Sequence, residues 1–269
     1  MLWNAKNGRV AIGPSDMDYV SFGSGPKNLI ILPGLSDGLA TVKGKALMLA
    51  GPYRRYCKNY TIYMFSRRSD LPEGISIREM AADQAQALQK LGIEKTSVLG
   101  VSQGGMIAQF LAADYPERVE KLVLAVTAPS ANPLIRDNIL TWIELAGRRE
   151  HRKLMIDTAE KSYSERFLRQ FRMSYPVIGF VGKPKSYDRF LANARAILDF
   201  DAGEAIGKIG CPTLIIGGEE DKIVGAQASR ELQEGIPGSR LYLYPGLGHG
   251  AYEEAKDFNK RVFAFLEEP

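Results

Sequence analysis

The segment 100–104, with the sequence GVSQG, has the form G-x-S-x-G, in which a serine occupies a strained turn between a strand and a helix. Glycines flank the serine because larger side chains would collide where the chain folds back. An apolar strand pattern at 97–101 leads into the motif, and a helix pattern at 103–114 leads out of it. We therefore predict that Ser102 is a nucleophile, and the alternative is an ordinary tight turn.

A serine hydroxyl needs a neighbouring base to take its proton, and this base is usually a histidine. The sequence contains only two histidines. His249 lies in the glycine-rich loop 246–250, after a strand pattern at 241–244, so we expect it at the same sheet edge as Ser102. His151 lies in a charged stretch, where we expect a surface position. His249 is therefore the predicted base.

The carboxylate that would orient the histidine is sought in the segment 217–224, which follows the preceding strand pattern. It contains three acidic residues, of which Asp221 is our choice. The resulting order of serine, acid and histidine along the chain is the one expected for this type of site. Glu219 and Glu220 remain the competing candidates.

Acyl transfer also needs hydrogen-bond donors for the oxyanion. The loop 32–38 follows the first buried strand pattern, in the position where such donors are supplied. We predict an oxyanion hole made by the backbone N–H groups of Leu35 and Gln103. The alternative for the loop is a glycine-rich turn without a catalytic role.

No motif predicts a cofactor or a metal. The segment 38–46 resembles a phosphate-binding loop faintly, but its spacing is wrong and Ala46 replaces the metal-binding hydroxyl. Cys57 and Cys211 lie far apart, without the spacing of a zinc site, so we expect reduced thiols.

The elements that must position these residues alternate between strand and helix, which predicts an α/β fold with a mostly parallel sheet. A turn-rich hairpin pattern at 9–22 predicts an antiparallel start. The predicted parallel strands are 28–32, 60–65, 97–101, 121–126, 212–216 and 241–244, and the clearest predicted helices are 76–91, 103–114 and 252–266.

The alternation stops after the fourth parallel strand, where 134–200 shows three helical patterns and no convincing strand. We predict a core domain at 1–133 and 201–269 with an inserted helical cap at 134–200. The cap holds 9 of the 25 aromatic residues and has 13 Lys and Arg against 8 Asp and Glu. This charge favours an anionic substrate group weakly, with solvated helix faces as the alternative. The candidate pocket residues, which could instead pack the cap onto the core, are Trp142, Phe171, Met173 and Tyr175.

Composition excludes several classes of protein. The chain is 45% hydrophobic and 25% charged, with a net charge of +4, as in ordinary globular proteins. It has no dense basic run, so nucleic acid is not an expected partner, and no apolar run of about 20 residues that would span a membrane. Because the N-terminus lacks the features of a signal peptide, we expect a cytoplasmic protein; the oligomeric state stays open.

Taken together, these motifs resemble the α/β-hydrolase superfamily over nearly the whole chain. The resemblance is carried by the elbow at 100–105, the DYPERV stretch at 114–119, the acidic loop around Asp221, and Gly248-His249. One departure is Pro33, where many members have a histidine, which alters the shape of the loop more than its chemistry. A serine nucleophile argues against the haloalkane dehalogenases, which attack with aspartate.

The resemblance implies Ser102 as nucleophile, Asp221 as acid and His249 as base, with the Leu35 and Gln103 N–H groups as oxyanion hole. The expected function is hydrolysis of a carboxylic ester, or a related acyl bond, of a small molecule through an acyl-enzyme. A C–C bond hydrolase or a perhydrolase would use the same residues. A ligand receptor with slow turnover is the alternative from another class.

Overall fold

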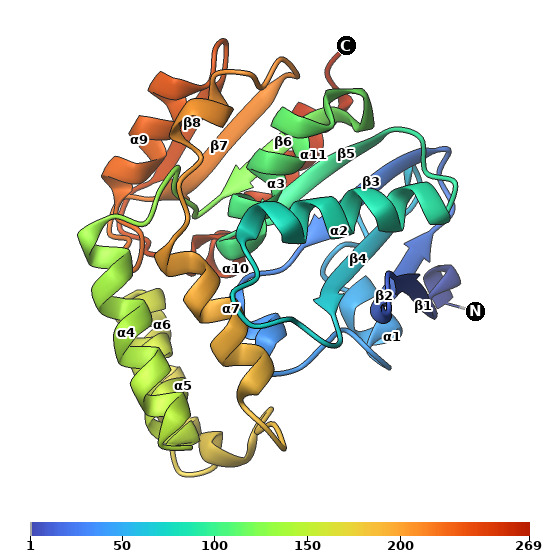
Figure 1. Cartoon of the computed structure of the whole chain (residues 1–269). Helices are drawn as coiled ribbons and strands as arrows, with labels where there is room; N and C mark the ends of the chain where they lie inside the picture. The colour runs from blue at the N-terminus through green and yellow to red at the C-terminus, as the bar shows by residue number, and fades with distance from the viewer. Residues whose placement is uncertain (1) are drawn as a thin grey trace.

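The computed structural model describes residues 2–269 and contains an eight-stranded sheet with the order β1-β2-β4-β3-β5-β6-β7-β8 (Figure 1). β1 and β2 form an antiparallel hairpin, β2 pairs antiparallel with β4, and all later pairings are parallel. The predicted α/β fold with an antiparallel start is therefore confirmed. The strands are β1 Lys6–Ile12, β2 Ser15–Gly23, β3 Lys27–Leu32, β4 Tyr60–Arg68, β5 Thr96–Val101, β6 Val119–Ala125, β7 Thr213–Gly218 and β8 Arg240–Tyr244.

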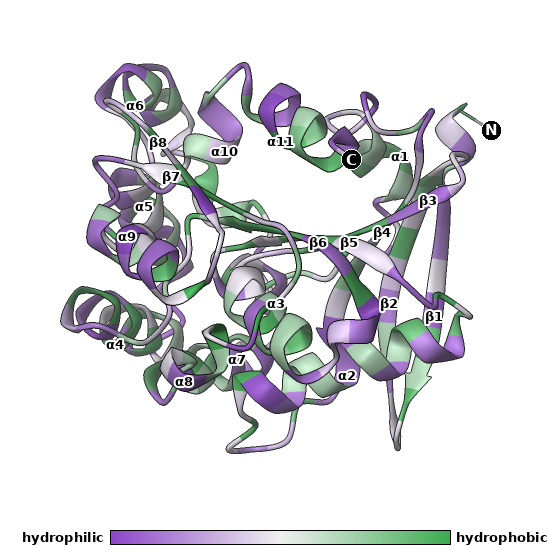
Figure 2. Ribbon diagram, turned by 90° about the horizontal axis from the view of Figure 1, so that it is seen from above, coloured by the Kyte–Doolittle hydropathy of each residue, from purple (hydrophilic) through white to green (hydrophobic). Residues whose placement is uncertain are grey.

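Helices cover both faces of the sheet, which explains why the parallel strands are apolar throughout (Figure 2). In β3, Leu29 and Ile31 pack against one helical layer, while Ile30 and Leu32 pack against the other. One layer consists of α1 Ala46–Ala50, α10 Ala251–Glu254 and α11 Phe258–Glu267. The other includes α2 Ile77–Lys90, α3 Gln103–Asp114, α8 Gly203–Ile206 and α9 Ala226–Gly235.

Of the helices between β6 and β7, four lie together at one end of the molecule (Figure 1). They are α4 Pro133–Gly147, α5 His151–Ser162, α6 Glu165–Phe171 and α7 Asp188–Leu198. The sequence predicted only three, and α5 was missed because its buried stripe includes His151 and Ser162 beside only two apolar side chains. The division into a core at 1–133 and 201–269 and a cap at 134–200 stays a prediction.

The last helical pattern, expected as one helix at 252–266, is also different in the structure. It is divided into α10 and α11, with a break at 255–257. Within residues 2–269, the helices lack the combination of length and apolar character that crossing a membrane requires.

Asn132 fixes the start of α4 and attaches it to the loop after β7. Its side chain accepts a hydrogen bond from the Ile135 N–H at 2.9 Å and donates one to the Val224 carbonyl at 2.9 Å. We expect Asn132→Ala to lower the free energy of unfolding by about 1–2 kcal/mol, measured by urea denaturation. Asn132→Ser, which keeps a capping oxygen, should lose less. An unchanged alanine variant would contradict this role.

Candidate active site

Ser102 lies in a strained turn between β5 and α3. Its φ is 53° and its ψ is −120°, a backbone conformation that residues other than glycine rarely adopt. The Ser102 N–H donates to the Ala125 carbonyl at 2.9 Å, and the Thr127 hydroxyl donates to the Ser102 carbonyl at 2.8 Å. The adjacent strand β6 and the loop that follows it therefore hold the strained residue in place.

The glycines of the motif are required by close approaches of the backbone. A Cβ at Gly104 would lie 1.9 Å from the Leu32 carbonyl oxygen, and a Cβ at Gly100 would lie 2.6 Å from the Gly104 carbonyl oxygen. Neither position can accept a side chain without moving the backbone.

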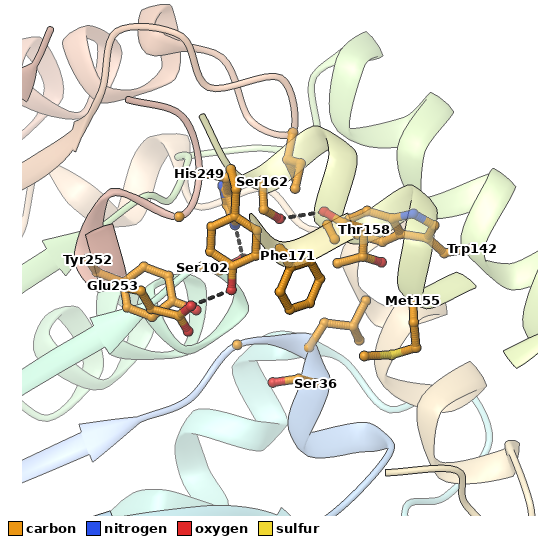
Figure 3. A pocket seen from close by; sticks show the side chains of 16 residues that line it. Ser36, Ser102, Trp142, Met155, Thr158, Ser162, Phe171, His249, Tyr252 and Glu253 are labelled. Atoms are coloured by element: carbon orange, nitrogen blue, oxygen red, sulfur yellow. Dashed lines mark hydrogen bonds between the residues drawn. The ribbon is translucent and has the colours of Figure 1, made fainter. Parts of the chain in front are cut away.

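The structure brings Ser102, His249 and Asp221 together at the carboxyl ends of β5, β8 and β7. Figure 3 shows Ser102 and His249 at the edge of the neighbouring cavity. His249 Nε2 lies 3.0 Å from Ser102 Oγ, and His249 Nδ1 lies 2.8 Å from Asp221 Oδ2. The competing carboxylates, Glu219 and Glu220, are exposed. The geometry therefore favours Asp221 as the partner of His249.

Asp221 is held as an anion beside the imidazole. Burial alone would raise its pKa, but His249 and the N–H groups of Val224 and Ile223 outweigh this effect, and the pKa of Asp221 lies below its ordinary value. Both N–H groups donate to Oδ1, at 2.9 and 2.8 Å. With the Nδ1 proton assigned to face Asp221, the Nε2 lone pair faces the Ser102 hydroxyl.

The two predicted oxyanion donors are at the starts of helices. Gln103 is the first residue of α3, and Leu35 is the first residue of a short 3-10 helix, Leu35–Gly38. N–H groups at this position precede the first hydrogen bond within a helix, so they are available to an external acceptor. The Leu35 segment lies against Ser102, because a Cβ at Gly34 would be 3.3 Å from Ser102 Cβ.

A cavity of about 220 Å³ opens beside Ser102 and His249. Trp142 and Phe171, two of the four aromatic and apolar residues proposed from the sequence, line it. The prediction is wrong for the other two. Met173 follows the end of α6 and is 82% exposed, while the Tyr175 hydroxyl is turned toward Glu160, to which it donates at 2.6 Å.

Sequence reasoning missed most of one wall of the cavity. α5 contributes residues at helical spacing, namely Met155, Thr158, Ala159 and Ser162. The spacing of three, one and three residues was the available signal, but small and polar side chains do not stand out as an apolar stripe.

His151 was expected on the surface and is instead buried, with Nε2 2.9 Å from the Val181 carbonyl oxygen. It is absent from the lining of the cavity beside Ser102. None of the described residues lining that cavity is a lysine or an arginine, and the one acidic side chain is Glu253. The positive charge of 134–200 therefore does not face this cavity, which removes the support that this charge gave to an anionic substrate.

Comparisons with known proteins give a consistent result. A family model described as alpha/beta hydrolase fold matches residues 57–256. A 2-hydroxy-6-oxononadienedioate/2-hydroxy-6-oxononatrienedioate hydrolase from Klebsiella pneumoniae is 32% identical, over 86% of this chain and 79% of that protein. A pimeloyl-[acyl-carrier protein] methyl ester esterase from Chromobacterium violaceum is 31% identical, over 63% of this chain and 69% of that protein.

Solved structures of other proteins share the fold of this chain. The crystal structure of the enol-lactonase from Burkholderia xenovorans has a TM-score of 0.83 at 21% identity, and the match covers 97% of this chain and 100% of that one.

Proposed function

The chain belongs to the α/β-hydrolase family, and from this premise we propose that it is a serine hydrolase that cleaves a carboxylic ester of a small molecule through an acyl-enzyme on Ser102. The observation that carries the proposal is the hydrogen-bonded series from Ser102 through His249 to Asp221, with distances of 3.0 and 2.8 Å. This series opens onto a cavity of small-molecule size.

The proposed reaction has two steps. His249 Nε2 takes the Ser102 proton as Oγ attacks the ester carbonyl, and Asp221 stabilises the imidazolium that forms. The Leu35 and Gln103 N–H groups receive the negative oxygen. His249 then returns the proton to the leaving alcohol, and the same residues activate water to release the acid and restore Ser102.

The cavity favours an uncharged acyl group of modest size. Its volume is below the range of about 300–1,000 Å³ that is common for drug-sized ligands. A carboxylate buried there would meet no lysine or arginine among the lining residues, and would lie in the same cavity as Glu253. A buried charge without a partner is strongly disfavoured.

C–C bond hydrolysis is the second candidate, because the Klebsiella pneumoniae relative is 32% identical over 86% of this chain. The name of that relative gives a dicarboxylate as its substrate. Among residues 2–269, none of those that line the cavity is a lysine or an arginine that could pair with either carboxylate, which favours the ester.

Two p-nitrophenyl esters of matched acyl length test the charge preference. We expect kcat/KM for p-nitrophenyl butyrate to exceed that for mono-p-nitrophenyl succinate by at least about 10-fold, because the second ester must bring a carboxylate into the cavity. Equal or faster turnover of the succinate ester would contradict an uncharged substrate.

The same assay separates the enzyme from a slow-turnover receptor. An enzyme releases many p-nitrophenol molecules per protein molecule at steady state. Release of less than about one product per protein molecule, together with tight binding of a ligand, would favour the receptor.

A further inference from the structure

Beside the predicted oxyanion hole lies a largely buried group of charged and amide side chains that the proposed reaction does not use. Its members are Arg67, Gln103, Asp37 and Arg189. Its centre is Arg67, near the end of β4, whose side chain is 2% exposed. β4, β3 and β5 are neighbours in the sheet, so Arg67 lies beside the loops that follow β3 and β5. These two loops supply Leu35 and Gln103.

The Arg67 guanidinium contacts both loops. Nη1 donates to the Gly34 carbonyl oxygen at 3.2 Å, and Nη2 donates to Gln103 Oε1 at 2.8 Å. The Gly34 carbonyl and the Leu35 N–H belong to one peptide unit, in which a trans bond points them in opposite directions. A hydrogen bond that fixes this carbonyl therefore also fixes the direction of the Leu35 N–H. A cationic donor on the carbonyl polarises the peptide and strengthens its N–H as a donor.

The hydrogen bond from Arg67 Nη2 restricts Gln103 in the same way. The Gln103 side chain is fully buried, and its Nε2 donates to the Asn193 carbonyl of α7 at 2.8 Å while Oε1 accepts from Arg67. Both ends of the side chain are thus occupied, which restricts the residue whose N–H is the other predicted donor.

The group carries a net positive charge. Asp37 Oδ2 lies 3.7 Å from Arg67 Nη1 and 2.6 Å from Nη2 of Arg189 of α7, so two guanidinium groups share one carboxylate. Burial lowers the pKa of Arg67 to about 10, so it stays protonated at neutral pH. A fixed positive charge behind the donors favours a transition state that develops negative charge in front of them.

We propose that Arg67 is a positioning residue of the oxyanion hole, which orients the Leu35 and Gln103 N–H groups through the Gly34 carbonyl and the Gln103 side chain. The inference rests on the proposed acyl-enzyme mechanism. Arg67 acts on the transition state and not on substrate binding, so its loss should lower kcat and leave KM nearly unchanged.

The test compares Arg67→Met with Arg68→Met. Arg68 is the next residue of β4 and pairs with Asp83 at 3.3 Å, outside this group, so it controls for charge removal from the same strand. The readouts are kcat and KM for p-nitrophenyl butyrate and the inhibition constant of trifluoroacetophenone, a ketone that forms a tetrahedral adduct with serine. Completed fluorophosphonate labelling gives the concentration of active sites.

For Arg67→Met we expect kcat per labelled site to fall about 10²-fold, with KM within about two-fold, and the ketone to bind more weakly by a similar factor. Arg68→Met should match the wild type. If labelled sites of Arg67→Met keep the wild-type kcat and ketone affinity, the residue is only structural and the proposal is overturned.

Should Arg67→Met fail to fold, Gln103→Met removes the acceptor of Nη2 and serves as the second variant. A fall in kcat of about 10-fold with a parallel loss of ketone affinity supports the proposal, and unchanged values overturn it. Failure of the proposed function is recognised separately: the wild type would not hydrolyse the ester, or Ser102→Ala would still do so.

Discussion

Ser102→Ala should lower kcat for p-nitrophenyl butyrate by about 10⁴-fold or more, because the proposed acyl-enzyme cannot form without Oγ. Any residual rate would come from the oxyanion donors and the binding of the ester, which the substitution leaves in place. The measurement is steady-state hydrolysis, with the wild-type and variant proteins purified identically so that a contaminating esterase is recognised. Turnover within about 10-fold of the wild type would exclude Ser102 as the nucleophile.

The same position offers a control for folding. Alanine keeps a Cβ at a φ of 53°, so the unfolding free energy of Ser102→Ala should stay close to that of the wild type. Glycine adopts this conformation without strain, and Ser102→Gly should be the more stable of the two variants by about 1 kcal/mol while being equally inactive. If Ser102→Gly is inactive but more stable than the wild type, the serine is retained for its chemistry at a cost in stability.

Asp221→Asn should lower kcat by about 10⁴-fold, the second largest effect expected. The carboxylate accepts from His249 Nδ1 at 2.8 Å, which fixes the tautomer that leaves Nε2 free to take the Ser102 proton. An asparagine amide can present its NH₂ group to Nδ1 and stabilise the opposite tautomer. The measurement is kcat and KM, with a circular dichroism spectrum to confirm folding.

The two carboxylates beside Asp221 supply matched controls. Glu219→Gln and Glu220→Gln change the same kind of group in the same loop, but both side chains are exposed. Each should keep kcat within about two-fold of the wild type. A large loss in either variant, with Asp221→Asn active, would reassign the acid.

The central strands and the three residues of the proposed site could be predicted because their signals are local. Buried parallel strands are continuous apolar runs, and the carboxyl ends of such strands meet at one edge, so the positions of Ser102, Asp221 and His249 followed from chain order. Chain order fits each of the three carboxylates at 219–221, so it could not separate them. The structure does so, because Asp221 is buried and lies 2.8 Å from His249 Nδ1, whereas the two glutamates are exposed.

The rest depends on packing between distant segments. α5 has few apolar residues, so its wall of the cavity had no hydrophobic signal. Met173 and Tyr175 lie only two and four residues beyond Phe171, but the end of α6 takes them out of the cavity. Nothing in the sequence around Arg67 indicates that this arginine is buried, because its partners come from the loops after β3 and β5.

The most direct test of the account is mass spectrometry of the intact protein and its peptides after rapid mixing with excess p-nitrophenyl butyrate and acid quenching. The account predicts a butyryl adduct on the peptide that contains Ser102, which appears as p-nitrophenol is released and is absent from Ser102→Ala. A fluorophosphonate should modify the same residue and block the adduct. Continued turnover with the adduct on another residue, or with fluorophosphonate-insensitive hydrolysis, would contradict an acyl-enzyme at Ser102.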